Sequence, residues 1–303
     1  QLMQQAGATR RGQPSTTHEE RHGQMSRETI TVAHSPDSDD AFMFYALATD
    51  KIDTGPFEFV HRLQDIETLN RAASTGQYEV SAVSIHAYAY VADKYALLNS
   101  GASMGEGYGP KVVSRTPLEP SELKGKRIAV PGLWTSAFLA LKLLEADCEC
   151  PVVPFDEIID VVKTGGVDAG VLIHEGQLFY RDHDLRQVID LGLWWLDETG
   201  LPLPLGGNVI RRDLGQEKMS RIAAFISESI QFSLAHREEA LNYALQFGRG
   251  LDPVEGNRFV EMYVNERTLD YQESGRRAVQ MFLDRGYEAG WIPHRVQVDF
   301  VGA

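Results

Sequence analysis

Residues 29–49 read TITVAHSPDSDDAFMFYALAT, and the pattern of this stretch recurs along the chain. Residues 29–33 alternate between polar and apolar side chains, which is typical of a strand, and residues 40–49 are apolar enough for a buried helix. Ser38 or Asp39 is well placed to cap that helix. A strand, a polar loop and a helix in this order form one unit of an α/β fold with a mainly parallel sheet.

Further units of this kind follow. In the first half of the chain, strands are predicted over 56–61, 79–83 and 111–114, and helices over 65–74 and 85–92. A second set has strands predicted over 127–130, 152–153 and 168–173, and helices over 135–145 and 156–163. After residue 216 the sequence becomes helical, with helices predicted over 219–248, 253–265 and 274–287. The first of these is expected to bend or break near His236.

Two segments rich in proline and leucine interrupt the pattern. Residues 116–120 (TPLEP) and 201–207 (LPLPLGG) look like crossings between two lobes. The predicted organisation is therefore a disordered tail (1–27), a large α/β lobe with a helical C-terminal part (28–114 plus 207–303) and an inserted small α/β lobe (115–206). Two lobes joined by two crossings make a clamshell, and a ligand is expected in the cleft between them.

The composition limits the partners. The chain has 29 Lys+Arg and 43 Asp+Glu, giving a net charge of −14. This charge argues against binding to nucleic acid or to an anionic membrane, but it leaves room for a small carboxylated ligand held by local donors. No apolar run approaches the roughly 18 residues of a membrane helix, and the N-terminal residues do not resemble a secretory signal. A cytoplasmic location is therefore expected.

Cofactor and metal motifs are also absent from the sequence. It contains no GxGxxG, Walker A, GxSxG or HExxH pattern, so neither a cofactor nor a metal is expected. The only cysteines, Cys148 and Cys150, are too few for a metal cage and too close together for an ordinary structural disulfide. Two reduced thiols are the expected state.

Hydroxyl and carboxyl side chains gather where predicted strands turn into helices, a common place for ligand contacts in α/β proteins. Six of these residues are candidate substrate contacts: Ser35, Asp40, Ser81, Ser84, Thr135 and Ser136. At each of these turns the alternative is that the side chains only cap the start of the helix that follows.

His174 follows the apolar strand predicted over 168–173. An imidazole at the carboxyl end of a strand can act as a general base near neutral pH. The alternative is a buried, hydrogen-bonded histidine with no catalytic role. Glu175 could orient the imidazole, but this pairing is weak because adjacent residues of a strand face opposite ways.

Longer motifs carry a family resemblance. They are Ser35-Pro36 with Asp40 and Phe42, residues 84–88 (SIHAY), Gly105 with 107–110 (GYGP), Pro131-Gly132 before 135–137 (TSA), 172–177 (LIHEGQ), 201–207 (LPLPLGG), and 262–265 (MYVN) with Thr268. On these residues the chain resembles the 1,4-dihydroxy-6-naphthoate synthases of the futalosine pathway of menaquinone biosynthesis. The resemblance extends from about residue 29 to about residue 287.

The resemblance implies a periplasmic-binding-protein-like (type II) fold and a lyase that converts cyclic dehypoxanthine futalosine to 1,4-dihydroxy-6-naphthoate. It implies that His174 is the proton-abstracting base in the interlobe cleft. It also implies that Thr135 and Ser136 hold substrate oxygens, with Ser81, Ser84 and the 34–40 loop nearby. Neither a metal nor a nucleotide is implied, and a homodimer is possible.

The first loop departs from the family pattern. The family usually has Ser-Pro-Cys-Pro-Asn-Asp-Thr-Phe, whereas residues 35–42 read Ser-Pro-Asp-Ser-Asp-Asp-Ala-Phe. Extra carboxylates therefore stand where the substrate should approach. On this ground a related lyase or dehydratase that acts on another carboxylated substrate remains open. A non-enzymatic protein that binds a small carboxylate is a separate alternative.

Overall fold

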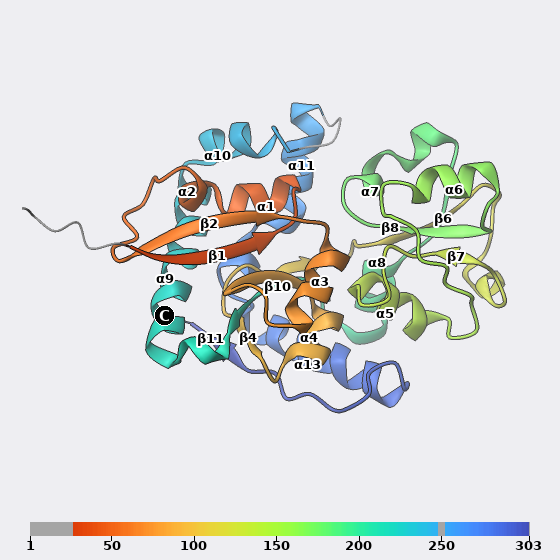
Figure 1. Ribbon diagram of the computed structural model, residues 1–303. Coiled ribbons are helices and arrows are strands. Elements are labelled where there is room, and N and C mark those ends of the chain that lie inside the picture. The colour runs from red at the N-terminus through yellow and green to blue at the C-terminus, as the bar shows by residue number, and fades with distance from the viewer. Residues whose placement is uncertain (1–26, 248–251, 303) are drawn as a thin grey trace, which may run out of the picture.

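The computed structural model describes residues 27–247 and 252–302, arranged as two lobes (Figure 1). Apart from Arg27, the tail predicted over 1–27 lies outside the described residues. Each lobe is built on its own sheet, and helices cover both sheets. The α/β class and the two-lobed arrangement predicted from the sequence are both present.

The larger sheet has the strand order β11-β4-β10-β3-β1-β2, and β5 pairs with β10. Its strands are β1 (Glu28–His34), β2 (Phe57–Leu63), β3 (Val80–Ser84), β4 (Tyr95–Leu98), β5 (Ser103–Gly105), β10 (Leu203–Arg211) and β11 (Phe300–Val301). β1 is parallel to both β2 and β3, and β10 runs antiparallel to β3. Because β1 and β3 are parallel neighbours, the loops that follow them leave the same edge of the sheet.

The smaller sheet has the order β7-β8-β6-β9. Its strands are β6 (Lys111–Ser114), β7 (Ile128–Ala129), β8 (Ala169–Leu172) and β9 (Arg186–Asp190). β6 pairs antiparallel with β8 and β9, so the small sheet begins at Lys111, before the start predicted at residue 115. Residues 116–120 follow β6 and are not the crossing, because the backbone of β6 is already hydrogen-bonded within this sheet. At the other end, residues 203–206 pair within the large sheet as part of β10, so the small lobe ends before Leu203 rather than at the predicted residue 206. The remaining predicted domain limits stay predictions.

Helices connect and cover the strands. In the first half of the chain they are α1 (Ser38–Met43), α2 (Tyr45–Ala48), α3 (Ile66–Ser74), α4 (Ile85–Val91) and α5 (Ser136–Leu144). The next three are α6 (Ile158–Thr164), α7 (Gly176–Phe179) and α8 (Leu191–Thr199). The C-terminal helices are α9 (Gln216–Ala235), α10 (Arg237–Ala244), α11 (Pro253–Tyr263), α12 (Glu266–Leu269) and α13 (Gln272–Glu288).

The helix boundaries confirm one sequence prediction and correct two others. The break near His236 is confirmed, since this residue separates α9 from α10. The single helix predicted over 40–49 is wrong, because Phe44 ends α1 and α2 begins after it. Neither Ser38 nor Asp39 caps α1: the N-cap position is Asp37, and its side chain makes no capping hydrogen bond.

One hydrophobic core extends through both lobes. It includes Tyr88 of α4 and Phe282 of α13 together with Leu139 of α5 and Val171 of the small sheet. These side chains are fully buried, and burial of apolar area is the main stabilising contribution in folding. The start of α5 is therefore held against the large lobe by continuous packing.

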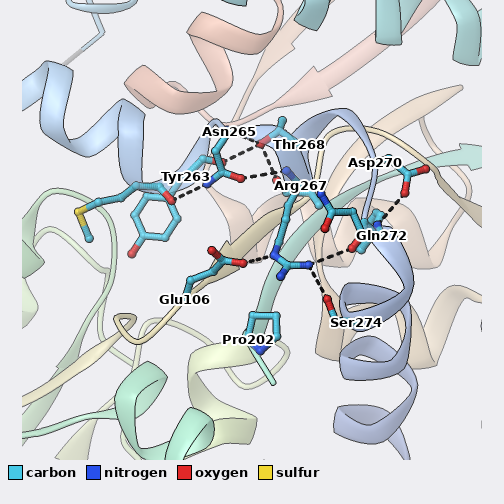
Figure 2. A network of polar contacts seen from close by, with 12 residues as sticks. Glu106, Pro202, Tyr263, Asn265, Arg267, Thr268, Asp270, Gln272 and Ser274 are labelled. Carbon is cyan, nitrogen blue, oxygen red and sulfur yellow. Dashed lines mark hydrogen bonds and ion pairs between the residues drawn. The ribbon is translucent and has the colours of Figure 1, made fainter. Parts of the chain in front are cut away.

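A polar network fixes the chain where it leaves the large sheet (Figure 2). Arg267 donates to the carboxylate of Glu106, to the carbonyl of Tyr271 at 3.2 Å and to the hydroxyl of Ser274 at 2.9 Å. Glu106 lies between β5 and β6, so the network ties this connection to α12 and α13. Tyr263, the last residue of α11, lies just before α12, and its side chain reaches the cavity between the lobes.

Candidate active site

A cavity with about 760 Å³ of empty space, part of it open to solvent, lies between the two lobes. Residues of both lobes line it, which places it where the clamshell prediction expects a ligand. Six of the seven residues singled out from the sequence are in its wall: Ser35, Asp40, Ser84, Thr135, Ser136 and His174. Ser35 follows β1 and Asp40 lies in α1. Ser84 ends β3, Thr135 and Ser136 stand at the start of α5, and His174 follows β8.

Ser81 does not line this cavity. Its hydroxyl is buried and donates to the carbonyl of Ala82 at 3.0 Å. Successive residues of a strand face opposite sides of a sheet, so the side chain of Ser81 faces away from the side where Ala82 and Ser84 meet the cavity. The geometry gives no support to the substrate contact predicted at Ser81.

His174 and Asp37 form an ion pair between the two lobes. Nδ1 of His174 lies 2.8 Å from Oδ2 of Asp37, and the Asp37 side chain is only 2% exposed. The ring of Phe155 meets the imidazole edge-on, with the centroids 4.9 Å apart. Because Asp37 occupies Nδ1, Nε2 is the nitrogen left to interact with a substrate.

Burial lowers the pKa of His174, but the carboxylates of Asp37, Glu175 and Asp39 outweigh this effect and raise the pKa to about 9. The unliganded site therefore holds a proton on His174 at neutral pH, unlike the near-neutral base expected from the sequence. Loss of that proton above about pH 9 leaves a neutral imidazole with Nδ1–H directed at Asp37 and Nε2 unprotonated, which is the form that a general base needs.

Asp37 is the functional residue that the sequence analysis missed. It was visible only as a departure from the family loop, where extra negative charge raised doubt about the substrate. The carboxylate hydrogen-bonded to His174 is thus that of Asp37, which is distant in sequence. The sequence had suggested the adjacent Glu175 for this role, as a weak pairing. His174 also has a left-handed backbone, with φ of 55°, which no sequence pattern indicated.

The other two aspartates of the loop play different parts. Oδ2 of Asp40 accepts hydrogen bonds from the amide and the hydroxyl of Ser35, both at 2.8 Å. Burial nevertheless raises the pKa of Asp40 to about 6, with Asp37 adding to the rise. Ser35 and Asp40 therefore line the cavity but first of all order the loop between β1 and α1.

Asp39 offers a hydrogen bond to a substrate. Its Oδ1 atom is buried and has no hydrogen-bond partner in the described part of the chain, and the side chain lines the cavity. Burial, with the neighbouring carboxylates of Asp40 and Asp37, raises the pKa of Asp39 well above its usual range. A protonated Asp39 can donate a hydrogen bond to a substrate oxygen. In that state the loop repels an anionic group less than three ionised aspartates would.

The hydroxyls at the start of α5 are engaged within the protein. The Thr135 side chain donates to the carbonyl of Gly132 at 2.8 Å and accepts from the amide of Phe138, so it caps the helix. The Ser136 hydroxyl donates to the carbonyl of Leu205 at 2.6 Å and accepts from the amide of His86. These bonds position the first turn of α5 in the cavity wall, where free amides favour a substrate carboxylate.

Ser84 is better placed to donate. It occupies the N-cap position of α4 but makes no capping hydrogen bond. Asn70 instead donates to its oxygen at 3.1 Å and accepts from its amide at 2.8 Å. The hydrogen of the Ser84 hydroxyl can therefore be directed at a ligand.

Three further polar residues in the cavity wall were not predicted. The Nδ2 atom of Asn208 is buried without a partner among the described residues, and the side chain is 1% exposed. The hydroxyl of Tyr263 donates to Oε1 of Gln177 at 2.8 Å, and this hydrogen bond joins the two lobes. Gln177 and Tyr263 both stand in runs that carry the family resemblance, and this was the signal available for finding them.

Tyr263→Phe should loosen this interlobe contact. Loss of one buried hydrogen bond is expected to lower the free energy of unfolding by about 1 kcal/mol, because the Gln177 acceptor is left unsatisfied. The measurement is urea-induced unfolding followed by circular dichroism. Tyr287→Phe is the matched control, since Tyr287 is 39% exposed. Equal unfolding midpoints for the two variants would contradict a stabilising role for the Tyr263 hydroxyl.

Within residues 27–247 and 252–302, no cluster of three or more His, Cys, Asp or Glu side chains is arranged to hold a metal ion. In the same ranges, no helix has the length and apolar character needed to cross a membrane.

Comparison with known proteins identifies the family. The menaquinone biosynthesis family matches residues 30–288. A protein of Thermus thermophilus named 1,4-dihydroxy-6-naphtoate synthase is 41% identical over 252 residues, which cover 83% of this chain and 92% of the relative. The chain belongs to the menaquinone biosynthesis family. A second family relative, from Streptomyces coelicolor and with the same name, is 35% identical over 275 residues, covering 89% of this chain and 96% of the relative.

Solved structures confirm the fold expected for this menaquinone biosynthesis protein. A crystal structure of a protein from Archaeoglobus fulgidus is 49% identical and superposes with a TM-score of 0.82, covering 87% of this chain and 98% of that one. The alkanesulfonate-binding protein of Xanthomonas axonopodis is 16% identical, with a TM-score of 0.67 and coverage of 92% and 99%. The second likeness shows only that the fold is periplasmic-binding-protein-like.

Proposed function

We propose that the protein is a lyase that converts cyclic dehypoxanthine futalosine to 1,4-dihydroxy-6-naphthoate in the futalosine pathway, with His174 as the general base. The names of the two curated relatives support the product, and the resemblance in the motifs supports the substrate. The same biosynthetic names support a cytoplasmic location.

The observation that carries the proposal is the His174–Asp37 pair in a cavity walled by both lobes. A retro-aldol-like fragmentation needs a base beside a carbonyl group and donors for the enolate that develops. Nε2 of His174 can take the proton, while Asp37 holds Nδ1 and stabilises the imidazolium that forms. The Ser84 hydroxyl and the Asn208 amide are the donors available to substrate oxygens, and Asp39 adds a third donor when it is protonated.

The reaction itself is the test. The purified full chain is incubated with cyclic dehypoxanthine futalosine, without added metal or nucleotide, and 1,4-dihydroxy-6-naphthoate is sought by mass spectrometry. We expect catalytic product formation, faster at pH 9 than at pH 7. Tight binding of the compound without product would contradict the proposal, and would favour a carboxylate-binding protein or a lyase that acts on another substrate.

A further inference from the structure

The two cysteines of the chain lie together on the small lobe, away from the cavity. The Sγ atoms of Cys148 and Cys150 are 3.7 Å apart, and both residues are free thiols. Nζ of Lys142, near the end of α5, lies 3.5 Å from the Cys148 sulfur. Cys148 is buried and Cys150 is half-buried, and the residue between them, Glu149, is exposed.

Lys142 is a buried ammonium group without a carboxylate partner. It is 7% exposed, and its Nζ donates to the carbonyls of Ala146 and Cys148 and lies 5.0 Å from the ring of Trp291. Among the described residues, no Asp or Glu oxygen lies within 4.0 Å of it. A buried charge that lacks a counter-ion is costly, and a thiolate on Cys148 would supply one.

The neighbouring thiol favours the same state. Cys150 hydrogen-bonds to the Cys148 sulfur, and this bond together with Lys142 outweighs burial and lowers the pKa of Cys148 to about 7. The same interaction raises the pKa of Cys150. At pH 7 about half of the molecules therefore hold a thiolate on Cys148 with a thiol beside it, which is the arrangement found at reactive dithiols.

We propose that Cys148 and Cys150 form a peroxide-reactive dithiol that closes to an intramolecular disulfide. The Cys148 thiolate attacks one oxygen of a hydroperoxide, the O–O bond breaks, and the products are a sulfenic acid on Cys148 and hydroxide or alkoxide. The Cys150 thiol then attacks the Cys148 sulfur, which forms the S–S bond and releases water. The peroxide gains two electrons and one proton, and the pair of one thiolate and one thiol loses them.

The local backbone allows this closure. Residues at positions i and i+2 of an extended segment face the same side, so the two sulfurs project together. Backbone hydrogen bonds pin the intervening residue, with the Glu149 amide donating to Lys126 and the Glu149 carbonyl accepting from Ile128. The sulfurs have to approach from 3.7 Å to about 2.0 Å, which side-chain rotation can supply.

The test is treatment of the full chain with hydrogen peroxide at pH 7, followed by intact-mass measurement and peptide mapping. The expected product has lost two hydrogens at the peptide that holds both cysteines and regains them with dithiothreitol. Cys150→Ser should instead accumulate a Cys148 sulfenic acid that dimedone traps. The proposal is wrong if the wild-type peptide keeps both thiols, or if dimedone fails to label Cys150→Ser.

The role of Lys142 is tested separately. Lys142→Met should slow alkylation of Cys148 by iodoacetamide at pH 7 by about tenfold, because loss of the ammonium group raises the pKa of the thiol and the thiolate fraction falls. Lys163→Met is the control, since Lys163 is exposed on α6. If Lys142→Met does not fold, the pH dependence of alkylation in Cys150→Ser decides instead, and a midpoint at or above about 8.5 would contradict activation by Lys142.

Discussion

His174→Asn is expected to lower kcat/KM for cyclic dehypoxanthine futalosine by about 10²- to 10⁴-fold, the usual contribution of a positioned general base. Asparagine is the best replacement because residue 174 has a φ of 55°, a left-handed conformation that Asn adopts more readily than most residues. The variant should therefore fold normally and lack only the imidazole. The measurement is steady-state kinetics at pH 9, where the parent protein has its neutral base.

His294→Asn is the matched control, because His294 is exposed and does not line the cavity. It should leave kcat/KM unchanged. Equilibrium binding of the substrate to His174→Asn, measured by calorimetry, separates loss of chemistry from loss of binding. A His174→Asn protein that retains most of the parent kcat/KM would exclude His174 as the base.

Asp37→Asn should have the second-largest effect, and it should change the pH profile as well as the rate. In the parent, Asp37 helps to hold the pKa of His174 at about 9, so kcat/KM should rise with pH up to about that value. Without this carboxylate, burial lowers the pKa of His174. The rising limb of the plot of kcat/KM against pH should therefore move to lower pH by about one unit or more. The limiting rate should fall by about 10²- to 10⁴-fold, because an amide does not hold the productive tautomer.

These two effects oppose each other at neutral pH, so the loss of activity should be smaller at pH 7 than at pH 9. Asp93→Asn also removes a carboxylate, but an exposed one. It should change neither the pH at which kcat/KM rises nor the limiting rate. A purely structural role for Asp37 would lower the rate without moving the limb. An unmoved limb in Asp37→Asn would therefore contradict the proposed pairing with His174.

The sequence was informative about the fold because its units are regular. A polar loop between an alternating strand and an apolar helix occurs at residues 29–49 and again along both lobes, and such units allow few arrangements other than an α/β sheet. Most of β10 was predicted as a crossing, and the short strands that were missed are β4, β5, β9 and β11. These short strands have few residues in which a pattern could appear. They are two to five residues long, so tertiary pairing rather than local pattern determines them.

The site was predictable in part for a similar reason. Ser84 and His174 stand at strand ends and Thr135 at a helix start, positions that a sequence reveals, and the structure brings them to one cavity. The sequence could not show that Asp37 crosses from the other lobe to His174, because the contact depends on how the two lobes close. Nor could it show that the Ser136 hydroxyl is used internally, because its acceptor, the carbonyl of Leu205, depends on the packing of α5 against β10. The capping role of Thr135, whose partners are local, was one of the alternatives that the sequence left open.

The most direct test of the account is a single-turnover experiment at pH 9 with protein in excess over cyclic dehypoxanthine futalosine. The parent and His174→Asn proteins are mixed with the compound, quenched over time and analysed for 1,4-dihydroxy-6-naphthoate. The account predicts product from the parent, and binding with at least about 100-fold slower product formation from His174→Asn. Equal rates from the two proteins, or bound substrate that neither converts, would contradict it.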